Sequence, residues 1–480
     1  MLNNAHSIRQ IINTISYIWD RIQNIYYINT RHSKTAYFRI TIPPKHYFYL
    51  ILCCLSILCI NLYNKYQIYK QLQNGRSFEA RIVNHYPKPQ THIKNKSQSE
   101  IFKFQDTFGN TYYGTYRGRF KNLQGIQARI YGKIYHCSFW QFFKGCKIYH
   151  SSFDIIPTHS VKARLTKFVE SQHQNALIAN LYNALFFAET LHKQLREIAI
   201  ALGISHLIAI SGLHLGVLLA AFFLCITPLY FLVHKHFFCY RNAMYDLSCL
   251  GLLFGFAYLI LIDFHPSFLR AYIMACIGFF MLYHGITIFN MTNLFLCVLC
   301  AIALNPNLLC NIGFILSISG VFYIFLFIRY ITESQKTPTT DLCKHHAKKI
   351  SKASQLIKLL SYSVLLTIII FLQMMPIVHV FFPYFSLWQL ISIPLSIIFP
   401  LVFPLLICIH IITFGSLFDS LIESIISNDF FLSQVTTPLW ILIPYILLSL
   451  LAIRYKWAYV INLCVACGFY IYNVIIFIHL

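Results

Sequence analysis

Long apolar runs recur along the chain and constrain its fold more than any other feature. A bilayer requires about 20 mainly apolar residues for each helical crossing. Charged residues make up only 11% of the 480 residues, against roughly 25% in typical soluble domains. The pattern therefore predicts a polytopic α-helical membrane protein with about 10 spans, near 47–65, 204–233, 245–263, 267–284, 289–305, 308–330, 359–382, 387–413, 434–452 and 457–478.

Basic residues set the expected orientation, because Lys and Arg gather on the cytoplasmic side of membrane proteins. Residues 1–46 hold six of them, and isoleucines within 7–29 recur at the spacing of an amphipathic helix lying on the membrane. We expect this segment in the cytoplasm, followed by a retained anchor rather than a cleaved signal peptide. The basic loops at 234–244 and 331–358 then also fall in the cytoplasm. A span within 181–200 would invert this order.

The segment 75–157 differs from the rest of the chain. Short segments of alternating polarity, such as Ser77–Val83 and Ala128–Ile134, are separated by turn residues. This pattern predicts a small all-β domain, most simply a barrel. One span precedes it, so we expect it outside the cytoplasm. Cys137 and Cys146 lie nine positions apart in that oxidising location, where a disulfide is expected.

The β-domain is basic, with thirteen Lys and Arg residues against four acidic ones. Barrel domains hold single-stranded nucleic acid by a positive groove with stacking aromatic rings. The candidate DNA-binding residues combine those two features: Tyr113, Tyr116, Arg117, Arg119, Lys121, Arg129 and Lys133. A Tyr-rich and Lys-rich composition throughout the chain offers a second explanation of the same pattern.

Polar residues interrupt the apolar run that begins near residue 204. Ser211 and Gly212 are expected to break the helix between His206 and His214, because serine favours a helix start and glycine frees the backbone. Non-helical backbone at membrane depth persists only in buried or water-filled surroundings. A half-helix start there would present N–H groups to an anion such as phosphate. The alternative is that Ser211 and Gly212 only allow close helix packing.

Arg270 is one of few charged residues in the membrane zone, and such residues are candidate functional groups. It could contact phosphate, pair with Asp263 or extend to the interface. Farther along, Gln373 and Pro376, then Gln389, Pro394, Pro400 and Pro404, interrupt a second pair of spans. Discontinuous spans of this kind commonly surround a transport pathway, although prolines are also tolerated as kinks.

Two sequence features are missing. The chain has no G-x-x-x-x-G-K-[ST] phosphate loop and no dense cluster of metal ligands. We therefore expect no cofactor, no metal site and no enzymatic activity. Any ATP-driven motor would be a partner protein.

The segment from His206 to His214, H-L-I-A-I-S-G-L-H, resembles the signature of the ComEC competence family, inner-membrane channels for single-stranded DNA. Four further segments are similar to family motifs, in the same order. Residues 183–190 resemble A-L-L-L-G-D-R with Ala188 and Glu189 replacing Gly and Asp, and 263–271 resemble G-x-S-P-S-x-x-R-A with Asp263 replacing Gly. Residues 305–317 resemble D-P followed by G-F-Q-L-S with Ile315 replacing Gln, and 376–400 resemble a proline-containing span leading to N-L-L-x-x-P.

The resemblance implies a DNA-uptake permease with an OB-like periplasmic domain at 75–157, stapled by a disulfide, and a channel core at 160–480. Many family members also carry a metallo-β-lactamase-like domain, for which this sequence shows no counterpart, so no nuclease role is expected. The expected path residues are His206, Ser211, Gly212, His214 and Arg270, with Asp263, Ser317 and Gln389 as weaker candidates.

By the same resemblance, the expected partners are single-stranded DNA, a periplasmic DNA-binding receptor with pilus machinery, and a cytoplasmic ATPase with single-strand-binding proteins. The expected location is the bacterial inner membrane. Two other functions fit the discontinuous helices: a secondary transporter or flippase for a small anionic or lipid-linked substrate, and a membrane scaffold without a conduit.

Overall fold

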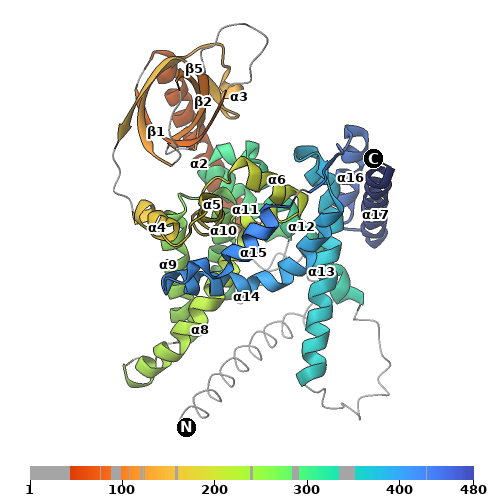
Figure 1. The fold of residues 1–480 in the computed structure, drawn as a ribbon. Coiled ribbons are helices and arrows are strands. Elements are labelled where there is room, and N and C mark those ends of the chain that lie inside the picture. The colour runs from red at the N-terminus through yellow and green to blue at the C-terminus, as the bar shows by residue number, and fades with distance from the viewer. Residues whose placement is uncertain are drawn as a thin grey trace, which may run out of the picture.

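The computed structural model describes residues 44–75, 77–87, 99–106, 109–118, 123, 125–156, 161–237, 240, 242–283, 291–334, 352–428 and 430–479. The amphipathic helix expected within 7–29 lies outside these residues, as do Arg119 and Lys121. The first described element is α2 (Pro44–Gln73), a 30-residue helix that leads to the β-domain. In Figure 1 the β-domain lies at one end of the molecule, above the helices.

Five strands form the β-domain: β1 (Phe78–Pro87), β2 (Ser99–Asp106), β3 (Thr111–Arg117), β4 (Gln127–Ile134) and β5 (Cys146–Ile156). They close into a barrel in the order β1-β2-β3-β5-β4, with β3 and β5 parallel and the other neighbours antiparallel. Buried residues alternate with accessible ones along β3 and β4, as expected for strands with one face in a core. The predicted barrel is confirmed. The short helix α3 (Phe139–Phe142) precedes β5, and a disulfide joins Cys137 to Cys146, whose Cα atoms lie 6.0 Å apart.

Polar contacts fasten the barrel to the helical core. Asp263, in the turn after α9 (Ala243–Leu261), pairs with Arg81 of β1 and lies 2.7 Å from Nζ of Lys162 in α4 (Val161–Glu170). On another side of the barrel, the Asn307 amide donates to Oδ1 of Asn110 at 3.1 Å. The barrel is therefore held at two places by loops of the core.

The helical core contains the remaining apolar helices. They are α5 (Ala176–Phe187), α6 (Lys193–Ala201), α7 (Ser205–Ile208), α8 (Gly212–Phe237), α9, α10 (Pro266–Tyr283), α11 (Met291–Leu304), α12 (Ile312–Ser334), α13 (Lys352–Phe381), α14 (Ser392–Ile411), α15 (Asp419–Ile426), α16 (Leu439–Leu451) and α17 (Lys456–His479). Short 3-10 turns, η2 (Pro306–Cys310), η4 (Leu387–Ile391) and η5 (Gly415–Phe418), connect some of them. Among the described residues, seven helices are long and apolar enough to cross a bilayer. The protein is a multi-pass membrane protein.

The region 181–200, where a span would have inverted the topology, is divided. The helix α5 has 12 residues and ends at Phe187, and the following residue, Ala188, adopts a left-handed conformation with φ of 57°. At 1.5 Å per residue it is about 18 Å long, well short of a bilayer core of about 30 Å. The helix α6 begins at Lys193, after five residues that belong to no helix. Neither piece is long enough to span the membrane alone.

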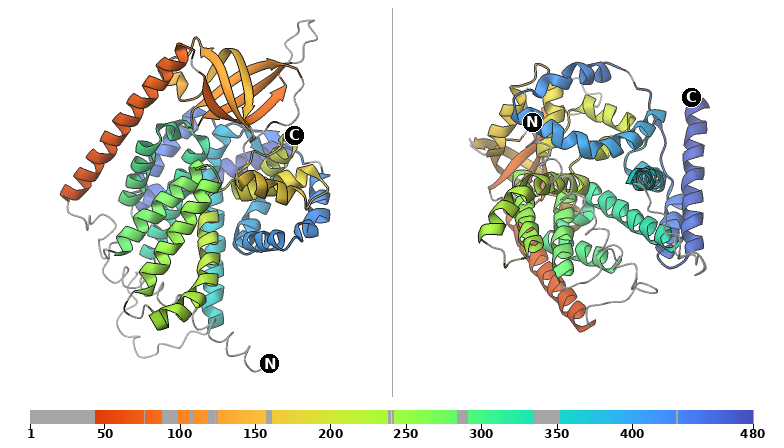
Figure 2. Two further views of the ribbon diagram at one scale, coloured as in Figure 1. Left: turned by 90° about the vertical axis from the view of Figure 1, so that its left-hand side faces the viewer. Right: turned by 90° about the horizontal axis from the view of Figure 1, so that it is seen from below.

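The expected crossing at 387–413 contains α14, whose place in the fold is set by a pair of short strands. Strand β6 (Tyr384–Phe385) precedes α14, strand β7 (Ser433–Gln434) follows α15, and the two strands pair with each other. Because β6 and β7 are neighbours, the chain between them must leave and return on one side of the membrane. Seen from below in Figure 2, α13 appears end-on whereas α14 lies lengthwise. Although α14 has the length and composition of a span, it lies across the molecule.

Contacts of the last two helices agree with this arrangement. The turn after α16 meets the far end of α12, where Arg329 donates to the carbonyl of Ile453 and Tyr330 donates to that of Ala452 at 2.5 Å. At the other end of α17, the ring of Phe477 lies 5.9 Å from that of Phe385. The helices α16 and α17 thus run away from β6 and back to it.

Candidate functional site

The expected helix break is present at the start of α8. The short helix α7 ends at Ile208, Ala209 is extended with ψ of 121°, and α8 begins at Gly212. The hydroxyl of Ser211 accepts a hydrogen bond from the backbone N–H of Leu213 at 3.2 Å. Serine at this place satisfies one of the N–H groups that every helix start leaves unpaired.

His214 lies one turn into α8 and is completely buried. Its Nδ1 accepts a hydrogen bond from the backbone N–H of Ser211 at 3.2 Å, so the other nitrogen, Nε2, carries the proton of the neutral ring. Nε2 is buried without a hydrogen-bond partner. The rings of Phe399 and Phe403, from α14, pack edge-on against the imidazole at 4.9 and 4.8 Å.

Arg270 of α10 approaches the same helix start from the neighbouring helix. Its side chain is buried, with 3% of the residue exposed. Nε donates to Oγ of Ser317 in α12 at 2.9 Å, and Nη1 lies 3.0 Å from the sulfur of Met274. Among the described residues no carboxylate pairs with Arg270. A buried guanidinium without a counter-charge is costly, and here it lies beside the positive end of a helix.

Gly212 allows this approach. A Cβ atom at this position would lie 3.0 Å from Nη2 of Arg270 and 3.3 Å from Cβ of Ala271. A side chain here would therefore force the guanidinium to shift by a few tenths of an ångström. Five of the eight expected path residues thus meet at one place: Ser211, Gly212, His214, Arg270 and Ser317.

The other three expected path residues lie elsewhere. His206 is exposed, and its ring nitrogens contact the carbonyl of Gly203 at 2.9 Å and the hydroxyl of Ser396 at 3.2 Å. The amide of Gln389 donates to the carbonyls of Tyr384 and Ile200, which fastens η4 to α6. Asp263 pairs with Arg81 and Lys162 below the barrel, and not with Arg270. These contacts of Asp263 attach the barrel to the helical core.

Electrostatics at the barrel junction reflect burial. Burial lowers the pKa of Lys162, and the nearby charge of Arg81 lowers it further, against the opposing effect of Asp263. Burial likewise raises the pKa of Glu189 in the turn after α5, with Lys162 and Arg81 opposing that shift. The junction is thus a compact group of two cations and two carboxylates between the barrel and the core.

The structure corrects part of the expected DNA-binding surface. Tyr116 is a core residue, 9% exposed, whose ring packs edge-on against Phe102 at 5.3 Å and Phe153 at 4.8 Å. Tyr116 lies four positions after the buried Tyr112 in β3, so both side chains face the same side of the strand. The two-residue alternation of a strand could therefore have predicted its burial. Arg129 is exposed but pairs with Glu79 at 2.7 Å. Arg117 is exposed at the end of β3, Tyr113 is half-buried and Lys133 points outward from β4.

Three residues that the sequence reasoning missed complete an aromatic and basic surface around Lys133. Tyr149 of β5 lies opposite Lys133 in the β4–β5 register, and its ring is 6.1 Å from that of Tyr135. Lys147 pairs in register with Tyr113 across β3 and β5. Tyr135, Lys147 and Tyr149 are exposed and line a surface hollow of about 290 Å³ beside the Cys137–Cys146 disulfide. We call Lys133, Tyr135, Lys147 and Tyr149 the outer barrel face.

No group of three or more His, Cys, Asp or Glu side chains that could hold a metal ion occurs in the part of the chain that the structure describes. The arrangement at α8 can instead bind an anion, through a guanidinium, a helix start and a hydroxyl. The break itself is the segment that resembles the competence signature.

The family model described as Competence protein matches residues 185–480. The chain belongs to the Competence protein family. The match covers the helix break, Arg270, Ser317 and α14, and it begins after the barrel. Comparison with curated proteins and with solved structures gives no match. Membership in the Competence family associates this protein with DNA uptake in natural transformation.

Proposed function

We propose that this protein conducts single-stranded DNA across the bacterial inner membrane, with the start of α8 as a contact for the DNA backbone. The observation that carries the proposal is Arg270, a buried cation without a carboxylate partner among the described residues, beside the helix start at Gly212. A phosphodiester would supply the missing negative charge and accept hydrogen bonds from the guanidinium at the helix start. His214 and Ser317 complete the contact.

The barrel would receive the strand before it enters the core. Its five-stranded closed topology is that of an OB-like domain, a fold that binds oligonucleotides. In the proposed topology it lies in the periplasm, where a DNA-binding receptor would deliver the strand. A cytoplasmic ATPase and single-strand-binding proteins would act on the other side. We assign no catalytic step and no cofactor to this chain.

Labelled DNA tests the proposal in cells that express single variants. Arg270→Met removes the charge, Arg270→Lys keeps it without the planar guanidinium, and Gly212→Ala crowds the guanidinium. A hydrogen bond to a charged group is worth about 1.5–3 kcal/mol, so we expect Arg270→Met to reduce DNA import into the cytoplasm roughly 10- to 100-fold. Arg454→Gln, an exposed arginine in the turn after α16, serves as the matched control, with membrane levels measured for every variant.

The rival function, transport of a small anion or a lipid-linked substrate, predicts a different outcome. If Arg270→Met is present in the membrane and imports DNA as well as the Arg454→Gln control, the conduit proposal is rejected. Retention of labelled DNA outside the cytoplasm, with import lost, supports it.

A further inference from the structure

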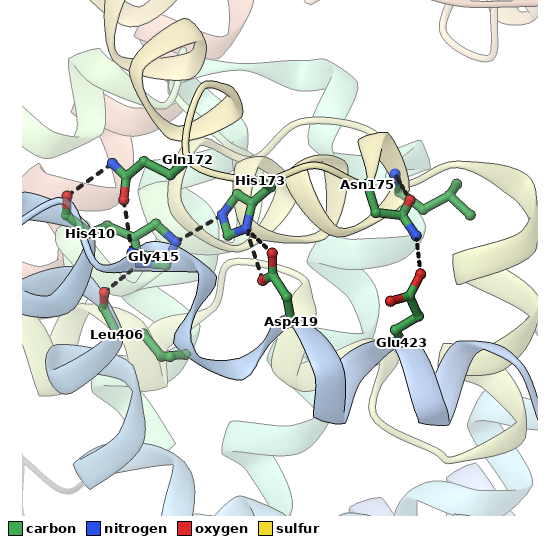
Figure 3. A network of polar contacts seen from close by, with 9 residues as sticks. Gln172, His173, Asn175, Leu406, His410, Gly415, Asp419 and Glu423 are labelled. Atoms are coloured by element: carbon green, nitrogen blue, oxygen red, sulfur yellow. Dashed lines mark hydrogen bonds and ion pairs between the residues drawn. The ribbon is translucent and has the colours of Figure 1, made fainter.

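Two buried histidines and an aspartate connect α14 and α15 to the loop between α4 and α5. Figure 3 shows His173 of that loop between His410, near the end of α14, and Asp419, at the start of α15. Nδ1 of His173 lies 2.9 and 3.0 Å from the two carboxylate oxygens of Asp419. Nε2 of His173 lies 3.2 Å from Nε2 of His410, whose Nδ1 lies 2.7 Å from the carbonyl of Leu406.

Counting hydrogens shows that this chain of contacts holds an added proton. A carbonyl can only accept, so Nδ1 of His410 must carry a hydrogen. The contact between the two Nε2 atoms requires one hydrogen, and the contact between His173 and Asp419 requires another. Three contacts need three hydrogens, whereas two neutral imidazoles and a carboxylate supply two. The third is an extra proton, whichever of the three groups carries it.

The surroundings leave little room for water to replace these contacts. The side chain of His173 is fully buried and His410 is 3% exposed. The ring of Tyr182 from α5 stacks on His173 at 4.8 Å and meets His410 at 4.4 Å. Two nearby carboxylates have other partners, because Glu170 of α4 accepts from Asn183 and Glu423 of α15 accepts from Asn175. Gln172 bridges the carbonyl of His410 and the N–H of Gly415.

We propose that the proton shared by His173, His410 and Asp419 is a latch that holds α14 and α15 against the α4–α5 loop. When the proton is lost as pH rises, two nitrogen lone pairs face each other across 3.2 Å. When a further proton is added as pH falls, two N–H groups face each other instead. The latch is therefore closed in an intermediate pH window and released on either side of it.

The latched element covers the proposed phosphate contact. Phe399 and Phe403 of α14 pack on His214, and Ser396 contacts His206 across the helix break. Movement of α14 would uncover His214 and the start of α8. This gating role rests on the proposed conduit, whereas the proton count and the latch do not.

Labelling of an engineered cysteine measures the latch without DNA. In the full chain with its free cysteines replaced, Ile422→Cys places a thiol on the half-buried face of α15 that packs on the core, and Ser420→Cys places one on its exposed face. Both positions carry a thiol, so dividing one maleimide labelling rate by the other at each pH removes the effect of thiol ionisation on the rates. We expect this ratio to rise several-fold as pH increases through the range in which histidines titrate, about pH 5 to 8 and upward.

Three variants assign the effect. Asp419→Asn leaves the extra proton without a nearby anion, so the labelling ratio should begin to rise at a lower pH. His410→Gln supplies an amide N–H to His173, so the ratio should stay low and independent of pH. Glu423→Gln, one turn along α15, should behave like the parent chain. A ratio that is independent of pH in the parent and unchanged by Asp419→Asn overturns the latch. A normal labelling response with DNA import unaffected by Arg270→Met counts against the conduit alone.

Discussion

Arg270 and Arg81 illustrate two uses of one residue type in a membrane protein. Arg81 meets a carboxylate, Asp263, at the barrel junction, and the pair positions a domain. Arg270 is buried and meets a hydroxyl and a thioether, and no carboxylate among the described residues pairs with it. Burial of an unbalanced charge costs several kcal/mol, so selection for fold stability alone would replace it with an apolar residue. In the proposed function, the phosphodiester of the DNA strand would balance the charge of Arg270.

Tyr149 and Tyr116 should separate binding from packing within the barrel. Tyr149 is 42% exposed on the outer barrel face, whereas Tyr116 is buried among phenylalanines. A stacked base is worth about 1–3 kcal/mol, so Tyr149→Ser should weaken binding of single-stranded DNA to the purified full chain roughly 5- to 100-fold. Tyr116→Phe keeps the core packing and should bind as the parent does. Equal affinities for Tyr149→Ser and the parent, measured by fluorescence anisotropy at fixed salt, would show that this face does not stack bases.

How far the site could be predicted depends on whether its contacts are local. Ser211, Gly212 and His214 lie within four positions, and their local chemistry predicted the break. Arg270 was identified because a charge in an apolar run is rare, but its contact with Ser317 depends on how α10 and α12 pack. Tyr149 and Tyr135 were missed because the aromatic and basic pattern was read along β3 and β4, whereas the surface is formed across β4 and β5.

At the scale of elements, the disulfide between Cys137 and Cys146 closes a small loop that contains α3 and leads into β5. The chain-entropy model gives about 2–3 kcal/mol for a loop of this size. We expect Cys137→Ser combined with Cys146→Ser to increase hydrogen exchange of α3 and the start of β5 under oxidising conditions. The hollow beside the outer barrel face should loosen with them, so affinity for single-stranded DNA should fall as well.

A free cysteine provides the control for that comparison. Cys310, exposed in η2 and outside the barrel, can be replaced by serine without removing a disulfide. If hydrogen exchange of α3 and β5 is the same in the double variant as in Cys310→Ser, the disulfide does not stabilise this part of the barrel.

The orientation of α14 is the part of the fold that the sequence could not predict. Hydropathy measures whether a helix tolerates lipid, not how it is oriented, and 387–411 passes that criterion. Its orientation is fixed by β6 and β7, two strands of two residues each that are separated by almost fifty positions. Such a short, non-local pairing leaves no periodic signal in the sequence. The barrel was predictable for the opposite reason, because buried and accessible residues alternate along the seven residues of β3 and the eight of β4.

Because α14 lies across the molecule, it determines on which side of the membrane each later segment of the chain is placed. Asn110 of the barrel contacts Asn307, and Phe431, after α15, packs on Phe477 near β6. With α13 ending on the barrel side, the segment 382–434 stays there. The turn at 452–455 then falls on the opposite side, with Arg329 and Tyr330. If α14 crossed the membrane instead, the chain after it up to residue 434 would lie on the side opposite the barrel. The turn at 452–455 would then lie on the barrel side.

Single cysteines in an otherwise cysteine-free chain distinguish the two topologies. We expect Asn428→Cys to react with a membrane-impermeant maleimide in spheroplasts, as a barrel position such as Lys147→Cys does. Arg454→Cys should react only after the membrane is permeabilised. Because β6 and β7 bind both ends of the segment to one place, no tilt of α14 can transfer residue 428 across the bilayer while that pairing persists. Reaction of Arg454→Cys but not of Asn428→Cys in intact spheroplasts would therefore require the β6–β7 pair to be absent in the membrane, and the latch that positions α15 beside His173 would be absent with it.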